Sequence, residues 1–413
     1  MRSRSLKLGL VAFGVMTLAV GYVAGRTTFT NGAADAVAQG TPPQLMDVYY
    51  PGTETLGADE FRVTACGTGM PSVRPKQAAA CWLVELGNGD KFLFDIGAQS
   101  MSRISAMKIP MDYLDKVFIG HLHIDHMGDL PILWTGGMKM NRTVPLRVWG
   151  PTGATPELGT RAAIEGLKQF AHWDDVSLLG KLDARAMEWE VNEFDFAAVN
   201  QVIYEENGVT IRSIPAIHVI DGAVSFILEW NGFKFAYSSD TFPNKWWMEH
   251  AKGADIAVHE CFAPPEVLIE KQNYEPGFAL WLSTIGHTSP AQFGKVMATT
   301  EPRMAVGYHF YNDFDTQPTV LKGVRMTYEG PVTLATDYMV FNVTRDDVRV
   351  RMAAVDQNIW PLPSTREKVV DQSLQQTYGE FTKSGEVMMR DVLEQIWGEI
   401  NETYGTNAQL PPE

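Results

Sequence analysis

Apolar positions in the first part of the chain fall into short runs that are separated by turns rich in glycine. Four runs have the length of strands: 61–66, 80–86, 91–96 and 116–120. Gly67-Thr68-Gly69 separates the first two runs, and the fourth leads directly into His121. Because strands are short and end at turn-forming residues, these runs are predicted to form a sheet.

A second set of apolar runs follows a stretch of different character. Residues 161–191 have the pattern of helices and loops, and residues 188–196 are acidic and aromatic. The second set of strand-like runs is 209–213, 224–230, 233–239, 256–259 and 304–308. Residues 289–299 are predicted to be helical, with Pro290 in the first turn, where proline is tolerated. Two sets of strands with helices between them favour a layered α/β arrangement.

The two ends of the chain differ from this pattern. Three cationic residues precede an uncharged apolar run at 8–25, and Ala36-Val37-Ala38 offers a cleavage site between small residues. This pattern predicts a secretory signal at residues 1–38, with an uncleaved membrane anchor as the alternative. Either interpretation places the rest of the chain in the periplasm or outside the cell.

The C-terminal end carries one amphipathic pattern. Met388, Val392, Ile396 and Ile400 recur at helical spacing within residues 386–400. This spacing predicts a helix whose apolar stripe packs against the body of the protein.

Charge and cysteine content limit the classes of function. The formal net charge is −15 and becomes −18 without residues 1–38, which carry four cations and one anion. A surface of this sign repels polyphosphate backbones, so nucleic acid is not favoured as a partner.

Cys66, Cys81 and Cys261 lack CxxC spacing, which excludes a cysteine-based zinc site. A Cys66–Cys81 bridge is one interpretation, but small buried thiols are favoured.

Candidate metal ligands cluster where the fourth strand ends. His121, His123, Asp125 and His126 lie within six positions. A single histidine is usually structural, but four nitrogen and carboxylate ligands in one loop can address two ions. A set without thiolates suits Zn²⁺, with Mn²⁺ or Fe²⁺ as alternatives.

The motif His-x-His-x-Asp-His resembles the signature of the metallo-β-lactamase superfamily. Other residues match the superfamily's pattern in order: Asp95 in Asp-x-Gly, His218, Asp240 and His309. The resemblance implies an αββα four-layer sandwich with two metal ions. It assigns one ion to His121, His123 and His218. It assigns the other ion to Asp125, His126 and His309, with Asp240 bridging the two.

Three further motifs are similar to those of the ribonuclease Z-like branch, which also contains arylsulfatases and phosphodiesterases. They are Gly67-Thr-Gly-Met-Pro71, His259-Glu260 and His287-Thr-Ser289. The resemblance covers residues 61–343. We therefore divide the chain into a signal or anchor (1–38), a linker (39–60), a hydrolase domain (61–345) and a C-terminal extension (346–413).

The resemblance also implies roles in hydrolysis. Two ions lower the pKa of a bridging water so that hydroxide forms near neutral pH. Asp125 is placed to orient that water and take its proton. His287, oriented by the Glu260 carboxylate, is the expected general acid, although a purely supporting role is the alternative. His259 is interpreted as a core or supporting residue.

The favoured substrate is a small ester, either an aryl sulfate or a phosphodiester. Aromatic residues between Asp240 and His287 are candidates for the pocket wall or the core: Trp246, Trp247, Phe278 and Trp281. The alternatives are a ribonuclease Z-type enzyme that processes the 3′ ends of tRNA, a lactone or amide hydrolase, and a non-catalytic exported metal-binding protein. A membrane contact is expected only through an uncleaved N-terminal segment, and a homodimer remains open.

Overall fold

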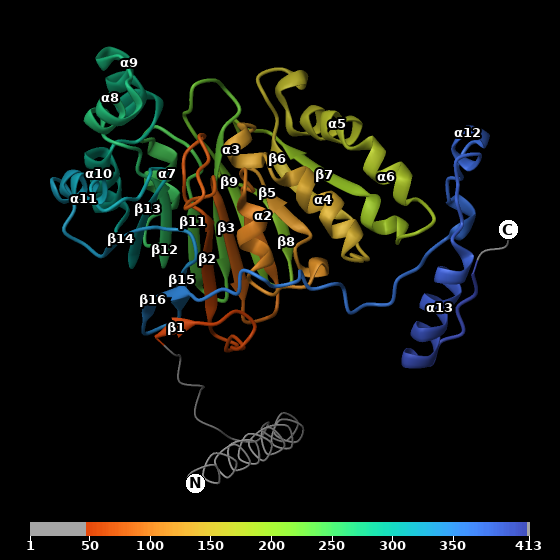
Figure 1. The fold of residues 1–413 in the computed structure, drawn as a ribbon. Coiled ribbons are helices and arrows are strands. Elements are labelled where there is room, and N and C mark those ends of the chain that lie inside the picture. The colour runs from red at the N-terminus through yellow and green to blue at the C-terminus, as the bar shows by residue number, and fades with distance from the viewer. Residues whose placement is uncertain (1–46, 411–413) are drawn as a thin grey trace, which may run out of the picture.

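Two sheets lie face to face in the computed structural model, which describes residues 47–410 (Figure 1). In spatial order the first sheet contains β1 (Val48–Tyr49), β16 (Val348–Ala353), β15 (Met339–Val343), β2 (Phe61–Gly67), β3 (Cys81–Leu86), β4 (Lys91–Phe94), β5 (Lys116–Phe118), β6 (Leu146–Pro151) and β7 (Trp189–Phe194). The second contains β14 (Val332–Leu334), β13 (Met304–Tyr308), β12 (Ile256–Glu260), β11 (Phe233–Tyr237), β10 (Val224–Trp230), β9 (Val209–Pro215) and β8 (Gln201–Glu206).

Helices cover the outer face of each sheet. The first sheet is covered by α2 (Ser100–Ser105), α4 (Leu130–Lys139), α5 (Thr160–Phe170) and α6 (His172–Leu178) (Figure 1). The second is covered by α7 (Lys245–His250), α8 (Pro265–Gln272), α10 (Pro290–Thr300) and α11 (Gln317–Arg325). The predicted αββα four-layer sandwich is therefore confirmed.

Aromatic side chains fill the space between the two sheets. The rings of Phe118 and Trp149 stack with centroids 4.8 Å apart. The ring of Phe94 packs against Phe226 of the opposite sheet, with centroids 5.7 Å apart. These strands bury both faces, one against the other sheet and one against helices, which explains why their sequences are continuous apolar runs. The tight packing gives the loops at the strand ends a rigid base.

Parallel strands determine where the ligand loops lie. β4, β5, β6 and β7 pair in parallel, and so do β11, β12, β13 and β14. Parallel neighbours have their carboxyl ends at one edge of the sheet, which is where α/β folds place their functional loops. The candidate ligands follow β5, β11 and β13, and they therefore meet at this edge.

The ends of the sheet extend beyond the expected hydrolase domain. β1 lies in the segment expected to be a linker, and it pairs in parallel with β16, which lies beyond residue 345. β16 in turn pairs with β15, which pairs with β2 of the expected hydrolase domain. The folded body therefore includes parts of both flanking segments.

The C-terminal helix forms as expected, but its packing does not. α13 (Arg390–Tyr404) follows the short α12 (Glu380–Lys383), and both stand apart from the sheets in Figure 1. Val392, Ile396 and Ile400 are each about half exposed, so the expectation that this stripe packs on the body is wrong. Helical spacing predicts which residues share a face, but it does not predict what covers that face.

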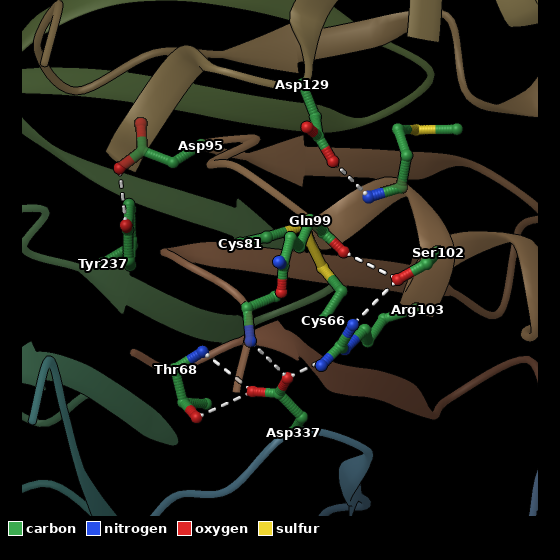
Figure 2. The surroundings of a disulfide bond; sticks show 12 residues. Cys66, Thr68, Cys81, Asp95, Gln99, Ser102, Arg103, Asp129, Tyr237 and Asp337 are labelled. Atoms are coloured by element: carbon green, nitrogen blue, oxygen red, sulfur yellow. Dashed lines mark hydrogen bonds and ion pairs between the residues drawn. A yellow bond between two sulfur atoms is a disulfide. The ribbon is translucent and has the colours of Figure 1, made fainter. Parts of the chain in front are cut away.

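Cys66 and Cys81 form a disulfide bond between β2 and β3 (Figure 2). The favoured interpretation of two free buried thiols is therefore wrong. Antiparallel pairing of the two strands, with an irregularity between Ala65 and Gly67, brings the Cα atoms of the two cysteines to 5.0 Å. Cys261 is a free, buried thiol.

The expected N-terminal signal or anchor lies outside the described residues. Within residues 47–410, no helix is both long enough and apolar enough to cross a membrane.

Candidate metal centre

Three histidines and one aspartate surround a first position for a metal ion. His121 and His123 come from the loop after β5, His218 follows β9 and Asp240 follows β11. The His123 Nδ1 atom lies 3.0 Å from His121 Nε2 and 3.4 Å from His218 Nε2. Asp240 Oδ2 lies 3.9 Å from His121 Nε2 and 3.8 Å from His218 Nε2.

A second group surrounds a neighbouring position. The short helix α3 (Ile124–Met127) carries Asp125 and His126, and His309 follows β13. His309 Nε2 lies 3.2 Å from Asp125 Oδ2 and 3.4 Å from Asp240 Oδ1. His126 Nε2 lies 3.3 Å from Asp240 Oδ1 and 3.5 Å from Asp125 Oδ2. Asp240 thus directs Oδ1 at this group and Oδ2 at the first group.

The donor atoms in both groups fit metal ions. Within each group the candidate ligand atoms all lie within 4.8 Å of one another. His126 Nε2 and Asp240 Oδ1 are buried and have no hydrogen-bond partner among the described residues. Buried polar atoms are rarely left unsatisfied, so converging lone pairs of this kind indicate a bound cation. The structure brings together all seven residues that are predicted as ligands.

Titration behaviour supports this interpretation. Burial lowers the pKa of His121 well below its usual value, and burial lowers the pKa of His218 to about 4. Both rings are therefore neutral at pH 7, the state in which imidazole binds a metal. Burial opposes protonation of His126, but nearby carboxylates, chiefly Asp240, outweigh it and raise the pKa of this ring well above its usual value. The negative charge of these carboxylates also attracts a metal cation.

Hydrogen bonds behind the ligands fix the orientation of the rings. His126 Nδ1 donates to Asp95 Oδ2 over 2.6 Å, and His218 Nδ1 donates to the Gly286 carbonyl over 3.0 Å. A donor bond from one ring nitrogen leaves the lone pair of the other nitrogen for the metal. Asp95 also accepts from Gly120 N at 2.7 Å, so it ties the histidine loop to the strand behind it.

Two residues in this network are not predicted from the sequence. The Tyr237 hydroxyl donates to Asp95 Oδ2 over 2.6 Å (Figure 2), and the Ser239 hydroxyl donates to the same oxygen over 2.9 Å. Ser239 Oγ also lies 3.2 Å from His121 Nδ1. The only sequence signal for either residue is its position just before Asp240, because the contacts depend on how the two sheets face each other.

Gly120 allows the two ligand loops to approach. A Cβ atom at this position would lie 2.3 Å from Cβ and Oγ of Ser239. We expect Gly120→Ala to lower the free energy of unfolding by about 1–3 kcal/mol, as overpacking does, and to weaken metal binding by moving His121. Chemical denaturation and competition with a chromophoric chelator measure these effects.

Gly136→Ala in α4 is the matched control, because the methyl group that it adds would meet nothing within 4 Å and alanine favours a helix. Equal metal affinity in the Gly120→Ala variant and the wild type would show that the close approach does not position the site.

The expected acid pair lies beside the metal positions. His287 Nδ1 lies 2.8 Å from Glu260 Oε2 and 3.8 Å from Asp240 Oδ2. The Phe262 ring stacks on the imidazole, with the two ring centroids 4.0 Å apart. Burial raises the pKa of Glu260 well above its usual value, and burial lowers the pKa of His287. Burial therefore opposes charge on either member of the pair, whereas the expected general acid is a charged imidazole.

The remaining candidates have different surroundings. His259 is buried, donates to the Glu260 carbonyl over 2.7 Å and packs edge-on against Trp247. Trp247 is fully buried in the core and does not wall a pocket. Phe278 and Trp281 are exposed and stack on each other with centroids 6.0 Å apart.

A cavity opens onto the first metal position. It has a volume of about 300 Å³, and the ligands His121, His123 and His218 form part of its wall. A second cavity of about 310 Å³ shares His218 and is bounded by Trp246. A molecule in the first cavity would contact the ligand histidines directly.

Comparison with known proteins identifies the family. The model of the family described as Anti-Pycsar protein Apyc1 matches residues 61–267, roughly half of the chain. Ribonuclease Z of Mycobacterium avium is 30% identical over 209 residues, which cover 48% of this chain and 69% of that protein. Ribonuclease Z of Mycolicibacterium paratuberculosis is 31% identical over 208 residues, with the same two coverages.

Solved structures share the fold. The metallo-β-lactamase fold protein YhfI from Bacillus subtilis superposes with a TM-score of 0.51 at 19% identity, covering 69% of this chain and 100% of that one. The short form of human tRNase Z superposes with a TM-score of 0.50 at 18% identity, covering 68% of this chain and 98% of that one. With the ligand geometry above, these matches lead to one conclusion: the chain belongs to the ribonuclease Z branch of the metallo-β-lactamase superfamily and is a metallohydrolase of that family.

Proposed function

We propose that this protein is a binuclear metal-dependent hydrolase of a small ester, either a phosphodiester or an aryl sulfate. One observation carries the proposal: the two oxygens of Asp240 face two adjacent groups of ligands. This arrangement fits two ions side by side, next to a cavity large enough for a small molecule. Zinc is the proposed metal because the donors are imidazole and carboxylate groups.

The chain's own residues divide the work of hydrolysis. Two bound ions would supply a water of lowered pKa and positive charge opposite the developing negative charge of the ester. Asp125, whose Oδ2 lies among the ligand atoms of the second group, is proposed to accept the proton of the attacking water. His287, held at Nδ1 by Glu260, is proposed to give a proton from Nε2 to the leaving oxygen.

His287→Ala tests the acid role. We expect this variant to keep both metals while kcat falls by about 10²–10⁴-fold for esters with poor leaving groups, because a general acid contributes that much. Esters of nitrophenol, which leave without a proton, should lose far less. Metal analysis and a plot of kcat against leaving-group pKa measure both effects. Loss of metal from the variant, or an equal loss for all leaving groups, would contradict the role.

Ribonuclease Z activity is the second candidate, and the names of the curated relatives favour it. Electrostatics oppose it, because the net charge of −15 repels RNA and no Lys or Arg is among the described residues that line the cavity. Cleavage of a precursor tRNA in the absence of small-ester turnover would favour the ribonuclease.

Export is also proposed. The disulfide between Cys66 and Cys81 supports it, because such bonds persist in oxidising compartments and are rare in the cytosol. The expected signal at residues 1–38 is consistent with the same compartment.

A panel of substrates tests the proposed function. The metal-loaded protein is incubated with nitrophenyl phosphodiesters, a nitrophenyl sulfate, a lactone and a precursor tRNA. We expect turnover of a phosphodiester or sulfate that chelation abolishes and added metal restores. Turnover of the lactone alone would favour that alternative, and two bound metals without any turnover would favour a metal-binding protein.

A further inference from the structure

The cavity at the first metal position has an apolar wall. Besides the three histidines predicted as ligands, its lining includes Leu158, Val219 and Ile220. Leu158, Val219 and Ile220 are exposed by 48%, 51% and 65%. Their apolar surface therefore faces the open space and is not covered by the protein core. Large side chains that remain exposed at a site mouth are typical of ligand-binding surfaces.

The charges around this cavity are negative or absent. Glu157 and Asp221 are its only charged lining residues within the described part of the chain. Cations that lie near the ligand loops are paired elsewhere: Arg74 bonds to Asp313 at 2.7 Å, and Arg103 bonds to Asp337 at 3.0 Å. Away from the proposed metal ions, a second phosphate or a carboxylate in this cavity would meet two carboxylates and no cationic side chain among the described lining residues, so an anionic group is disfavoured.

The loop that carries Val219 and Ile220 is held in place next to the ligands. Ile217 N donates to Thr241 Oγ1 over 3.0 Å, and Phe242 N donates to the Ile217 carbonyl over 2.7 Å. Thr241 directly follows the bridging Asp240, so the loop and the bridging ligand share one support. Val219 has a φ of +32°, a conformation that β-branched residues rarely adopt. Strain of this kind persists where a local arrangement is strongly determined, as at ligand sites.

An exposed aromatic ring also lies near the backbone that supports His218. A Cβ atom added at Gly286 would lie 3.4 Å from the Trp281 ring. The Gly286 carbonyl accepts a hydrogen bond from His218 Nδ1. Trp281 therefore lies close to a ligand histidine while remaining 44% exposed. The segment 276–286 contains no charged residue.

We infer that this cavity binds an uncharged, apolar group of the substrate, so that the substrate is an ester with an alkyl or aryl group that lies against Leu158, Val219 and Ile220. The inference rests on the proposed hydrolase function and specifies its substrate class. The metal positions hold the polar ester, and the cavity selects its apolar group. The carboxylates of Glu157 and Asp221 disfavour a nucleotide or polyanionic chain at this position.

A series of alkyl 4-nitrophenyl phosphates tests the inference, because the leaving group stays constant while the alkyl group grows. We expect kcat/KM of the metal-loaded protein to rise about fourfold for each added methylene until the cavity is filled. A chain of equal length that ends in a carboxylate should lose most of this gain. A flat dependence on chain length, or equal rates for the charged chain, would overturn the inference.

Variants locate the effect. Leu158→Ser and Ile220→Ser should each reduce the increase in kcat/KM per added methylene to less than twofold. The comparison is made within each variant, so a general loss of activity cancels. Ile132→Ser in α4 is the matched control, since this isoleucine is 52% exposed but does not line the cavity. If the control changes the gain as much as Ile220→Ser does, the cavity is not the binding site.

A binding measurement separates the inference from the proposed function. Calorimetry with methyl, propyl and pentyl phosphonates, which are not hydrolysed, reports whether affinity for the metal-loaded protein rises with chain length. Chain-length-dependent binding that Ile220→Ser reduces, without turnover of any ester, would uphold the inference and refute the hydrolase proposal. Ester turnover without this dependence would refute the inference and leave the hydrolase proposal standing.

Discussion

Asp240→Asn is expected to lower kcat by about 10³-fold or more, because it removes the one charge that faces both metal positions. Asparagine preserves the volume of the side chain and one oxygen, but it presents an amide NH₂ group to the other ligand group. Asp240 Oδ1 lies 3.3 Å from His126 Nε2, so this group would be placed where an ion is expected. Metal analysis should show fewer than two ions per chain.

Asp129→Asn is the control for that substitution. Asp129 is also buried, but its Oδ2 accepts from Met101 N at 2.8 Å and belongs to neither ligand group (Figure 2). We expect this variant to retain both metals and activity within a few-fold of the wild type. If Asp240→Asn binds two ions and keeps turnover within tenfold of the wild type, Asp240 does not bridge the metals.

Replacement of both Cys66 and Cys81 by alanine is expected to lower the free energy of unfolding by about 3 kcal/mol, as estimated for a closed loop of this length. The two cysteines are 15 residues apart in the chain, and their bond closes the loop that contains Thr68 and Ala80. Denaturant titration measures the change. Cys261→Ala is the control, because that thiol is buried and unpaired.

The disulfide loop also supports the metal site. His309 N donates to the Thr68 carbonyl over 3.0 Å, and Gly97 N donates to the Ala80 carbonyl over 2.8 Å. We therefore expect weaker metal binding in the double variant as well. A thiol titration of the denatured, unreduced protein should find one free thiol. Three free thiols, or unchanged stability of the double variant, would contradict the structural role of the disulfide.

Four of the seven candidate ligands could be predicted from the residues themselves because they lie close together in the sequence. They lie within residues 121–126, and the resemblance supplied the other three. Asp240 and His309 follow the parallel-paired strands β11 and β13, whereas His218 follows β9, which pairs antiparallel. The alternation of strands and helices indicated a layered α/β arrangement, and the resemblance to the metallo-β-lactamase superfamily implied its four layers. The histidine cluster and the strand runs are short segments whose pattern the sequence displays directly.

The disulfide was one interpretation but not the favoured one, and the cavity was not predicted, because both depend on how separate segments pair and pack. Cys81 pairs with Gly67 across an irregular register, and nothing in the sequence reveals that irregularity. Leu158 and Ile220 come from loops far apart in the chain and meet only in the folded protein. Trp247 was expected either in the pocket wall or in the core, and the packing of α7 places it in the core.

The C-terminal helix shows a different limit. The spacing of Val392, Ile396 and Ile400 identifies one face of α13, but a hydrophobic pattern does not specify its partner. In β1 the partner is defined but the sequence pattern is not. A strand of two residues is too short to show a hydrophobic alternation, and it forms through pairing with β16.

The number of metal ions per chain, measured together with turnover of a nitrophenyl phosphodiester, tests the central claim most directly. The ligand geometry predicts two ions per chain, loss of turnover when they are chelated and recovery as the second ion is restored. A protein that binds at most one ion at saturation, or that hydrolyses the ester equally well without metal, would contradict the binuclear hydrolase.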